Sequence, residues 1–238
     1  MLRFLPNFIT LMNLFCGSLA VIFLFEDKTY LVPVLILSAA ILDFFDGFVA
    51  RLVGTSGPLG KELDSLADMV SFGLVPGLIM YHYIGNIELS QQYVWLPYTG
   101  LLITLGACYR LAVFNISLNQ SHEFIGIPTP AATMFFLSYP IFEVLYEDHF
   151  LKEVLFNPYI MLFSTVLFTY LMNASFPLIA MKFNSFKINR ENGFRYTLIL
   201  TGITGLIIFQ LASIPFLILA YVIISVIKNL SKKKGSLS

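Results

Sequence analysis

The sequence predicts an all-α fold, a polytopic bundle of about eight transmembrane helices that forms one domain over residues 1–238. Two observations lead to this prediction. Of the residues, 58% are hydrophobic and only 12% are charged, whereas about 25% are charged in ordinary soluble domains. The hydrophobic residues also gather in stretches of about 20, the length that a helix needs to cross a bilayer. The alternation of apolar and polar residues that is typical of a membrane β-barrel is absent.

The charge balance excludes several other classes of protein. Fourteen Lys and Arg residues against 14 Asp and Glu residues give a formal net charge of zero, which leaves no excess of positive charge to neutralise a nucleic acid. The high hydrophobicity excludes a disordered chain. Both cysteines lie inside apolar runs, so a disulfide framework is not indicated. We therefore expect an integral membrane protein that does not bind nucleic acid.

Eight apolar segments are long enough to form the helices. In chain order they are residues 5–25, 30–52, 64–85, 94–115, 128–146, 155–180, 193–210 and 213–230. The first segment could be read as a signal peptide, but Pro6, Asn7 and Asn13 inside it favour a retained helix. The last two segments come from one apolar stretch, residues 196–230, which Pro215 should break because proline cannot continue the backbone hydrogen bonds of a helix. If the stretch is unbroken, the chain has seven helices with one long final span.

The distribution of Lys and Arg predicts the orientation of these helices. With eight spans and an inner N-terminus, all 14 basic residues except Lys28 and Lys152 fall at inner ends, which is the pattern of cytoplasmic loops. Both termini should therefore be cytoplasmic. Our expectation for the location is a multi-pass protein of the bacterial inner membrane, with its active site at the cytoplasmic face. Residues 1–147 carry the motifs described below, and residues 148–238 should add further helices.

Four aspartates lie where a bilayer normally excludes charge. Asp43 and Asp46 interrupt the second segment after an apolar run, and Asp64 and Asp68 open the third. A carboxylate inside a membrane segment costs at least about 2.5 kcal/mol and marks a functional site by default. Spacings of three and four residues place the members of each pair on one face of their helix. The four aspartates are therefore the first candidates for a functional site.

The connection between the two pairs predicts that all four carboxylates meet. Residues 54–60 are rich in glycine, serine and proline, which indicates a short break between two antiparallel helices. The carboxylates would then converge at the cytoplasmic boundary, where so many negative charges cannot all stay ionised without a cation. Hard oxygen ligands suit Mg²⁺, Mn²⁺ or Ca²⁺ rather than Zn²⁺. We predict a divalent-cation site here, and two ions would fit the charge.

An alternative is that these acids form a buried salt-bridge network with Arg51, Lys61 and Arg110. Against this alternative, Gly47 and Ala50 lie within about one turn beyond the second aspartate and leave room for a ligand or another backbone. Arg51 follows at the membrane boundary, where its guanidinium could hold a phosphate group. The pattern thus favours a site open to a phosphorylated ligand over a closed network of ion pairs.

The spacing of these residues resembles the signature of the CDP-alcohol phosphatidyltransferase family. Every position of that signature is filled, in the order Asp43-x2-Asp46-Gly47-x2-Ala50-Arg51-x8-Gly60-x3-Asp64-x3-Asp68. The resemblance implies an enzyme in which two divalent ions, Mg²⁺ or Mn²⁺, hold the pyrophosphate of a CDP-linked lipid. The implied metal ligands are Asp43, Asp46, Asp64 and Asp68. It also implies that Asp68 is the general base.

The resemblance also implies a binding site for the cytidine nucleotide. The positions that it assigns to this side are Gly47, Ala50, Arg51 and Gly60. Thr10 and Asn13 would join them if the first helix packs against the second and third. Arg110, near the inner end of the fourth segment, is our candidate for binding the acceptor or the lipid phosphate, because a guanidinium binds carboxylates and phosphates well.

One branch of the family, the membrane-integral phosphatidylserine synthases, is similar over roughly residues 4–140. The similar stretches are Pro6-Asn7-x2-Thr10-x2-Asn13-Leu14-x2-Gly17, the run Gly60–Gly73, Tyr109–Asn115 and Phe124–Ala131. Val113 departs from the branch, where many members have a second basic residue. Without a basic side chain at this position, one contact to an anionic group of a substrate is in question, while the expected reaction is the same. Homodimers are common among related enzymes, so the resemblance also implies a homodimer.

The resemblance implies that CDP-diacylglycerol and L-serine react to give phosphatidylserine and CMP. The same fold could instead use glycerol phosphate, inositol phosphate or choline as the acceptor alcohol. A phosphorylated acceptor should require more basic residues near Arg110 than this chain offers. A remote alternative is a divalent-cation transporter, which would need acids along a path to both faces of the membrane. The second and third segments contain no acids toward the outer face.

Overall fold

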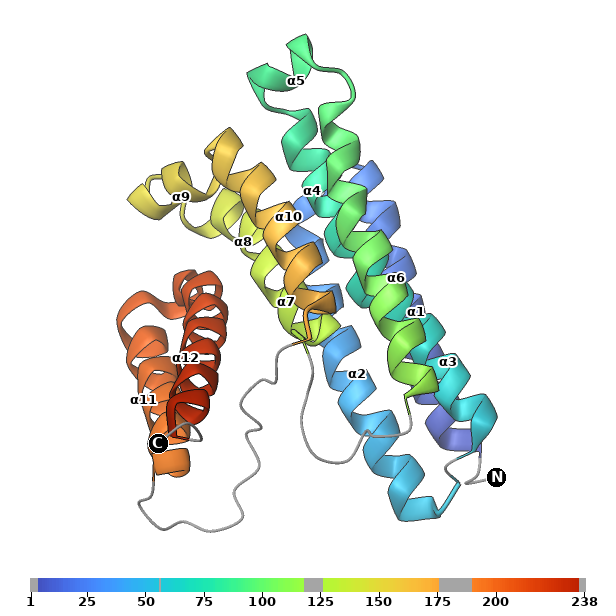
Figure 1. Cartoon of the computed structure of the whole chain (residues 1–238). Coiled ribbons are helices and arrows are strands. Elements are labelled where there is room, and N and C mark those ends of the chain that lie inside the picture. Colours follow the sequence, from blue (N-terminus) through green and yellow to red (C-terminus); the bar gives the residue numbers. More distant parts are fainter. Residues whose placement is uncertain (1–3, 56, 118–125, 176–189, 236–238) are drawn as a thin grey trace.

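The computed structural model describes residues 4–55, 57–117, 126–175 and 190–235, and every regular element in these ranges is a helix (Figure 1). The all-α prediction is therefore confirmed for the described part of the chain. The α-helices are α1 (Leu5–Phe25), α2 (Val32–Val53), α3 (Pro58–Asp68), α4 (Val75–Gly85), α5 (Glu88–Gln92), α6 (Leu101–Ile116), α7 (Thr129–Phe136), α8 (Ser138–Leu145), α9 (Phe150–Leu155), α10 (Pro158–Asn173), α11 (Arg190–Phe209) and α12 (Ile214–Gly235). Short segments of other helix types are η2 (Thr29–Leu31), η3 (Met69–Leu74), η4 (Leu96–Gly100) and η5 (Gln210–Ser213).

Five helical stretches in the described ranges are long and apolar enough to cross a membrane. They run over Leu5–Phe25, Thr29–Val53, Pro58–Gly85, Leu96–Ile116 and Tyr196–Ile227. The first four correspond to the first four expected spans, although the third begins at Pro58 rather than at residue 64. These helices fit an integral membrane protein, while the count of eight crossings stays a prediction.

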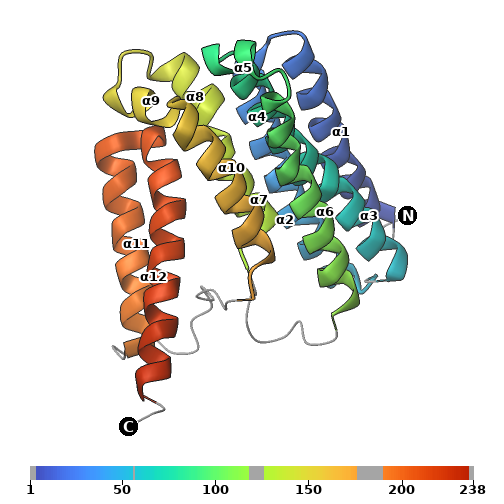
Figure 2. The same cartoon turned by 45° about the horizontal axis from the view of Figure 1, so that its top comes forward.

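The last apolar stretch folds into a helical hairpin rather than one long helix. The stretch contains α11 and α12, which lie side by side in Figures 1 and 2 and are joined by the 3₁₀ turn η5. Gln210 opens this turn with a positive φ of 50°. The expected break in the apolar stretch is thus present, a few residues before Pro215.

Two further expected spans are shorter in the structure than in the prediction. The segment expected at 128–146 consists of α7 and α8, which are separated at Leu137. The segment expected at 155–180 contains α10, which has 16 residues and ends at Asn173. Residues 176–180 lie outside the described residues. Neither segment reaches the length of the five long stretches.

Helix α1 turns its small and polar side chains inward. Its buried residues recur every three or four positions, which defines one helix face, and they are Pro6, Thr10, Asn13, Gly17, Ala20 and Leu24. Large apolar residues such as Phe8 and Phe15 are exposed. Because lipid is as apolar as these side chains, small residues at a helix interface are the ones that let backbones approach. This face packs against α2, α3 and η3.

The ends of the bundle differ in what they carry. The start of α1, the connection from α2 to α3 and the end of α12 lie at one end of the molecule, and α5 and α9 lie toward the other (Figures 1 and 2). We call these the α2–α3 end and the α5 end. Because α1 starts and α12 ends at the same end of the molecule, the arrangement agrees with an even number of crossings. The cytoplasmic placement of that end is a prediction.

Candidate functional site

The candidate site lies where α1, α2 and α3 meet. Helix α2 ends at Gly54, whose φ of 66° is left-handed and suits glycine at the end of a helix. Pro58 starts α3, a position where its missing N–H costs nothing. Helix α1 contacts both α2 and α3, and α2 approaches the third span at η3. The first helix therefore packs against the second and third, which was the condition for Thr10 and Asn13 to face the aspartates.

Three of the four aspartates come together in space. One carboxylate oxygen each of Asp43, Asp64 and Asp68 lies within 4.8 Å of the others. All three side chains are partly buried. Such a cluster is a suitable cradle for a hard divalent cation, because it offers several carboxylate oxygens and little competing water.

The fourth aspartate is held by the first helix. Asp46 is only 6% exposed, and its Oδ2 accepts a hydrogen bond of 2.6 Å from the hydroxyl of Thr10. It lies one turn from Asp43 on the same face of α2. The structure thus places Asp46 beside the cluster, tied to α1. Its role as a metal ligand stays a prediction.

Several buried polar atoms at the site have no hydrogen-bond partner among the described residues. They are Oδ1 of Asp68, both amide atoms of Asn13 and Nε of Arg110. Asn13 is fully buried and its side chain lies beside the Asp68 carboxylate. The charge of Asp68 also acts on Arg110. Buried polar atoms normally find partners, so this convergence indicates a place for a polar ligand or ion.

The alternative of a closed salt-bridge network finds no support. Among the described residues, ion pairs within 4.0 Å join Lys28 to Glu26 and His82 to Asp27, and none involves the four aspartates. Lys61 donates instead to the backbone carbonyl of Asn115 at 2.6 Å. The carboxylates therefore face one another without a neutralising basic side chain in contact, which fits a bound cation.

The residues expected on the nucleotide side line the end of α2 and the start of α3. Arg51 is exposed, and its Nη1 lies 3.4 Å from the point that a Cβ on Gly47 would occupy. The corresponding point on Gly60 is 3.5 Å from the Asn7 side chain of α1. Ala50 is partly exposed on the last turns of α2. A Cβ at either glycine would make ordinary van der Waals contact with these polar side chains, so both glycines lie directly beside Arg51 and Asn7.

Asn115 fixes the end of α6 against α3 and escaped our list of site residues. It exchanges two hydrogen bonds with Ser65, at 3.1 and 2.8 Å, besides accepting from Lys61. These bonds join the helix of Arg110 to the helix of Asp64 and Asp68. The signal was present in the sequence, since Asn115 ends the motif that begins at Tyr109.

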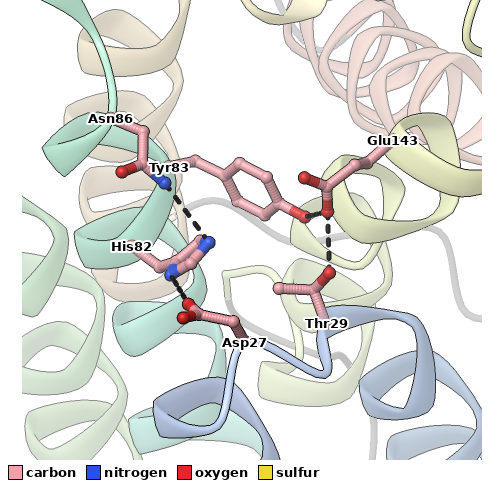
Figure 3. Close-up of polar contacts among 6 residues, drawn as sticks. All are labelled: Asp27, Thr29, His82, Tyr83, Asn86 and Glu143. Atoms are coloured by element: carbon pink, nitrogen blue, oxygen red, sulfur yellow. Dashed lines mark hydrogen bonds and ion pairs between the residues drawn. The ribbon is translucent and has the colours of Figure 1, made fainter.

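A second polar network lies toward the α5 end (Figure 3). Glu143 on α8 accepts hydrogen bonds from Thr29 at 2.7 Å and from Tyr83 at 2.5 Å. His82 lies 4.0 Å from Asp27 and 3.4 Å from Asn86. Sequence reasoning overlooked Glu143, although the same rule that flagged the aspartates, an acid inside an expected span, applied to it. The network joins η2, α4 and α8 and is separate from the aspartate cluster.

Comparison with known proteins identifies the family. The family model for CDP-alcohol phosphatidyltransferase matches residues 3–183. A Helicobacter pylori protein named CDP-diacylglycerol–serine O-phosphatidyltransferase is 36% identical over 167 residues, which cover 68% of each chain. Proteins of the same name from Bacillus subtilis and Methanocaldococcus jannaschii are 36% and 33% identical, over 56% and 57% of this chain and 73% and 59% of their own lengths.

The matched region contains both aspartate pairs and the α6 residues that face them, and it accounts for most of the chain. Among the residues matched are Asp43, Asp64 and Asp68, whose carboxylate oxygens lie within 4.8 Å of one another. On these grounds the chain belongs to the CDP-alcohol phosphatidyltransferase family.

Proposed function

We propose that this enzyme transfers the phosphatidyl group of CDP-diacylglycerol to the hydroxyl of L-serine, giving phosphatidylserine and CMP. The observation that carries the proposal is the cluster of Asp43, Asp64 and Asp68 near Arg110, whose buried Nε has no hydrogen-bond partner among the described residues. The names of the relatives from two bacteria and an archaeon support serine as the acceptor. The site's position at a helix end supports it too, since lipid tails can stay in the bilayer while serine and CMP exchange with water.

The carboxylate cluster fits divalent ions. Asp68 has a buried oxygen without a partner among the described residues, and all donors in the cluster are hard oxygens. Asp43, Asp64 and Asp68 would hold the ions, with Asp46 joining from the next turn of α2. When bound, Mg²⁺ or Mn²⁺ would neutralise the pyrophosphate and stabilise the charge that develops on the leaving CMP.

Asp68 is our candidate for the general base. Serine's hydroxyl is a weak nucleophile at neutral pH and needs a base within hydrogen-bond reach. The serine oxygen would form a bond to the phosphorus that carries diacylglycerol, while the bond from that phosphorus to CMP breaks. The hydroxyl proton would pass to Asp68 and then to solvent. Asn13, whose amide lies beside this carboxylate, would keep it oriented.

Arg110 and Arg51 would bind different parts of the two substrates. Arg110 is largely buried near the Asp68 carboxylate, so its guanidinium can hold the serine carboxylate or the lipid phosphate close to the reacting oxygen. Exposed Arg51, over Gly47, would hold phosphate on the nucleotide side, with Ala50 and Gly60 leaving room for the cytidine.

The second candidate function is the same chemistry with another acceptor alcohol. A phosphorylated acceptor such as glycerol phosphate or inositol phosphate should need a second basic group beside Arg110. In the described residues, the position one turn away in the same motif is Val113, and Lys61 is engaged with Asn115. This arrangement favours an acceptor with a single carboxylate or no phosphate, which is consistent with serine.

The decisive experiment measures CMP release by purified protein in lipid nanodiscs. The assay supplies CDP-diacylglycerol, Mn²⁺ and, in turn, L-serine, glycerol phosphate, inositol phosphate or choline. We expect release that depends on serine and yields phosphatidylserine. Turnover with a phosphorylated alcohol alone, or release of CMP that is independent of any alcohol, would reject serine as the acceptor.

Metal removal tests the cation site separately. Treatment with EDTA should abolish serine-dependent CMP release, and excess Mn²⁺ or Mg²⁺ should restore it, because the carboxylate cluster alone lacks the positive charge to stabilise the leaving group. Zn²⁺ should restore much less activity, since it prefers nitrogen and sulfur ligands. Full activity in the presence of chelator would contradict the metal site.

A further inference from the structure

The helix that carries Asp64 and Asp68 changes its winding directly after Asp68. Residues Met69–Leu74 form η3, a π-helical turn inside the continuous stretch α3–η3–α4. The N–H of Val75 bonds to the carbonyl of Val70, five residues earlier. Such turns are rare inside helices and often occur at functional sites. This one lies immediately beyond the proposed base.

Pro76 provides the physical cause of this turn. A proline inside a helix removes one hydrogen bond and its ring crowds the carbonyl four residues earlier. For Pro76 that carbonyl belongs to Phe72, in the middle of the π-helical turn. A wider turn relieves the crowding, but the Phe72 carbonyl then needs another donor, because water is scarce in a buried part of a membrane protein.

Hydroxyl groups from two other helices contact the Phe72 carbonyl and the Gly73 carbonyl that follows it. Thr133 of α7 is fully buried, and its Oγ1 lies 3.0 Å from the Phe72 carbonyl and 2.8 Å from the Thr129 carbonyl of its own helix. Thr104 of α6 donates to the Gly73 carbonyl at 3.1 Å. Two consecutive carbonyls of the turn are therefore bonded across helix interfaces.

A third hydroxyl joins the turn to the first helix. Ser71 is fully buried and donates at 3.1 Å to the backbone carbonyl of Asn13, the residue whose side chain lies beside Asp68. Gly17 makes this approach possible, since a Cβ there would lie about 3.0 Å from Ser71 Cα. The turn is thus held by α1, α6 and α7 together, which surround the third span in Figure 1.

We propose that Pro76, Thr104 and Thr133 are positioning residues, which hold the π-helical turn and thereby aim Asp64 and Asp68 at Asp43. Each residue rotates an α-helix by about 100°. A π-helical turn accommodates one additional residue, so its conversion to regular α-helix would rotate Asp68 relative to α4 by about that angle. The carboxylate would then leave the cluster. This inference rests on the proposed function and adds what fixes the geometry of its site.

The test uses full-length protein in nanodiscs and compares four kinds of variant. Thr104→Val and Thr133→Val, alone and combined, keep the shape of the side chain and remove the donor. Thr104→Ser and Thr133→Ser retain it. Pro76→Ala restores an N–H to the helix. Thr165→Val is the matched control, because Thr165 is also fully buried but donates to Met161 of its own helix α10.

Three measurements are made on every variant: Mn²⁺ binding by electron paramagnetic resonance, the thermal unfolding midpoint, and kcat and KM for CMP release. We expect the double valine variant to bind Mn²⁺ about 10- to 100-fold more weakly and to lose a similar factor in kcat, as for groups that orient metal ligands. KM for CDP-diacylglycerol should change less than kcat. The serine variants and Thr165→Val should remain close to the wild type.

Pro76→Ala separates positioning from stability. It should weaken Mn²⁺ binding while the unfolding midpoint stays the same or rises, because the helix gains a hydrogen bond. Normal Mn²⁺ affinity in Pro76→Ala and the double valine variant would overturn the inference, as would parallel losses of midpoint and affinity in all variants including Thr165→Val. If the wild type releases no CMP with serine but these Mn²⁺ differences persist, the proposed function fails and the positioning role stands.

Discussion

Single residues decide the chemistry of this protein because the bilayer makes each buried polar atom costly. Asp68 combines a buried oxygen lacking a partner among the described residues with two neighbouring carboxylates. Asn13 and Arg110 bring further partnerless atoms to the same place. The sequence identified all three, Asn13 through the family resemblance. It did not identify the contact between Asn115 and Ser65. Each residue lies in a motif that resembles the family, but neither motif shows that the two segments meet.

Asp68→Asn should abolish turnover while the fold is kept. The amide has nearly the shape of the carboxylate but cannot accept the serine proton, and a general base contributes about 10²- to 10⁴-fold to the rate. We expect kcat for CMP release to fall by at least that factor. Asp148→Asn, at an exposed position between α8 and α9, is the control. Near-normal kcat in the Asp68 variant would show that another group is the base.

Thr10→Val should weaken the tie between α1 and α2. The hydroxyl of Thr10 donates to the buried Asp46 carboxylate, and hydrogen bonds to charged groups are worth about 1.5–3 kcal/mol. The free energy of unfolding should fall by about that amount, and Thr10→Ser should recover most of it. Ser18→Ala, which removes an exposed hydroxyl from the same helix, should have no comparable effect. Equal stability of Thr10→Val and wild type would contradict the importance of this bond.

At the scale of whole elements, the sequence predicted helix positions well where the pattern of apolar residues was regular. Long apolar runs predicted the first four spans within two residues of their observed ends, except that the third begins at Pro58 rather than at residue 64. The sequence missed the π-helical turn at Met69–Leu74 and the separation of α7 from α8 at Leu137. Both depend on contacts with other helices: the turn is held by hydroxyls from α6 and α7, which lie 30 or more residues further along the chain.

Glu143→Ala should destabilise the α5 end without changing catalysis. The substitution leaves the hydroxyls of Thr29 and Tyr83 without their acceptor, and a buried unsatisfied group costs about 1–3 kcal/mol. Differential scanning calorimetry should therefore show a lower unfolding midpoint, with kcat at permissive temperature close to the wild-type value. Glu143→Gln keeps an acceptor oxygen and should lose less. Glu147→Ala, at an exposed position, is the control. A large drop in kcat alone would instead link this network to the reaction.

At the scale of the whole molecule, the main prediction concerns orientation. Basic residues cluster at the α2–α3 end, where the positive-inside rule predicts cytoplasm, and the start of α1 and the end of α12 lie at that same end (Figure 2). The site would then face the cytoplasm. An odd number of crossings would place the two chain ends on opposite sides.

Cysteine labelling tests this orientation directly. In a variant whose native cysteines Cys16 and Cys108 are replaced by serine, Asp148→Cys should react with a membrane-impermeant maleimide in intact cells. Ser238→Cys should react only after the cells are permeabilised, because an even number of crossings returns the C-terminus to the cytoplasm. Labelling of Ser238→Cys in intact cells would instead show that the chain crosses the membrane an odd number of times.

The sequence by itself determined the chemistry and the class of fold. A charged side chain is energetically unfavourable inside a bilayer, so four aspartates at spacings of three and four residues indicated a cation site. Apolar runs long enough for a helix to cross the membrane indicated a helical membrane protein. Whether the last apolar stretch formed one helix or two was open in the sequence, and the hairpin of α11 and α12 decided it.

Only the tertiary structure decided which carboxylates meet and which neighbouring helices orient them. Asp43, Asp64 and Asp68 share a cluster while Asp46 is bonded to α1, and this division depends on how α1 packs against α2 and α3. The proposed positioning of Asp68 depends on a π-helical turn whose Phe72 and Gly73 carbonyls accept hydrogen bonds from hydroxyls of α7 and α6. Helical periodicity describes one helix at a time, so it cannot report hydrogen bonds that other helices supply.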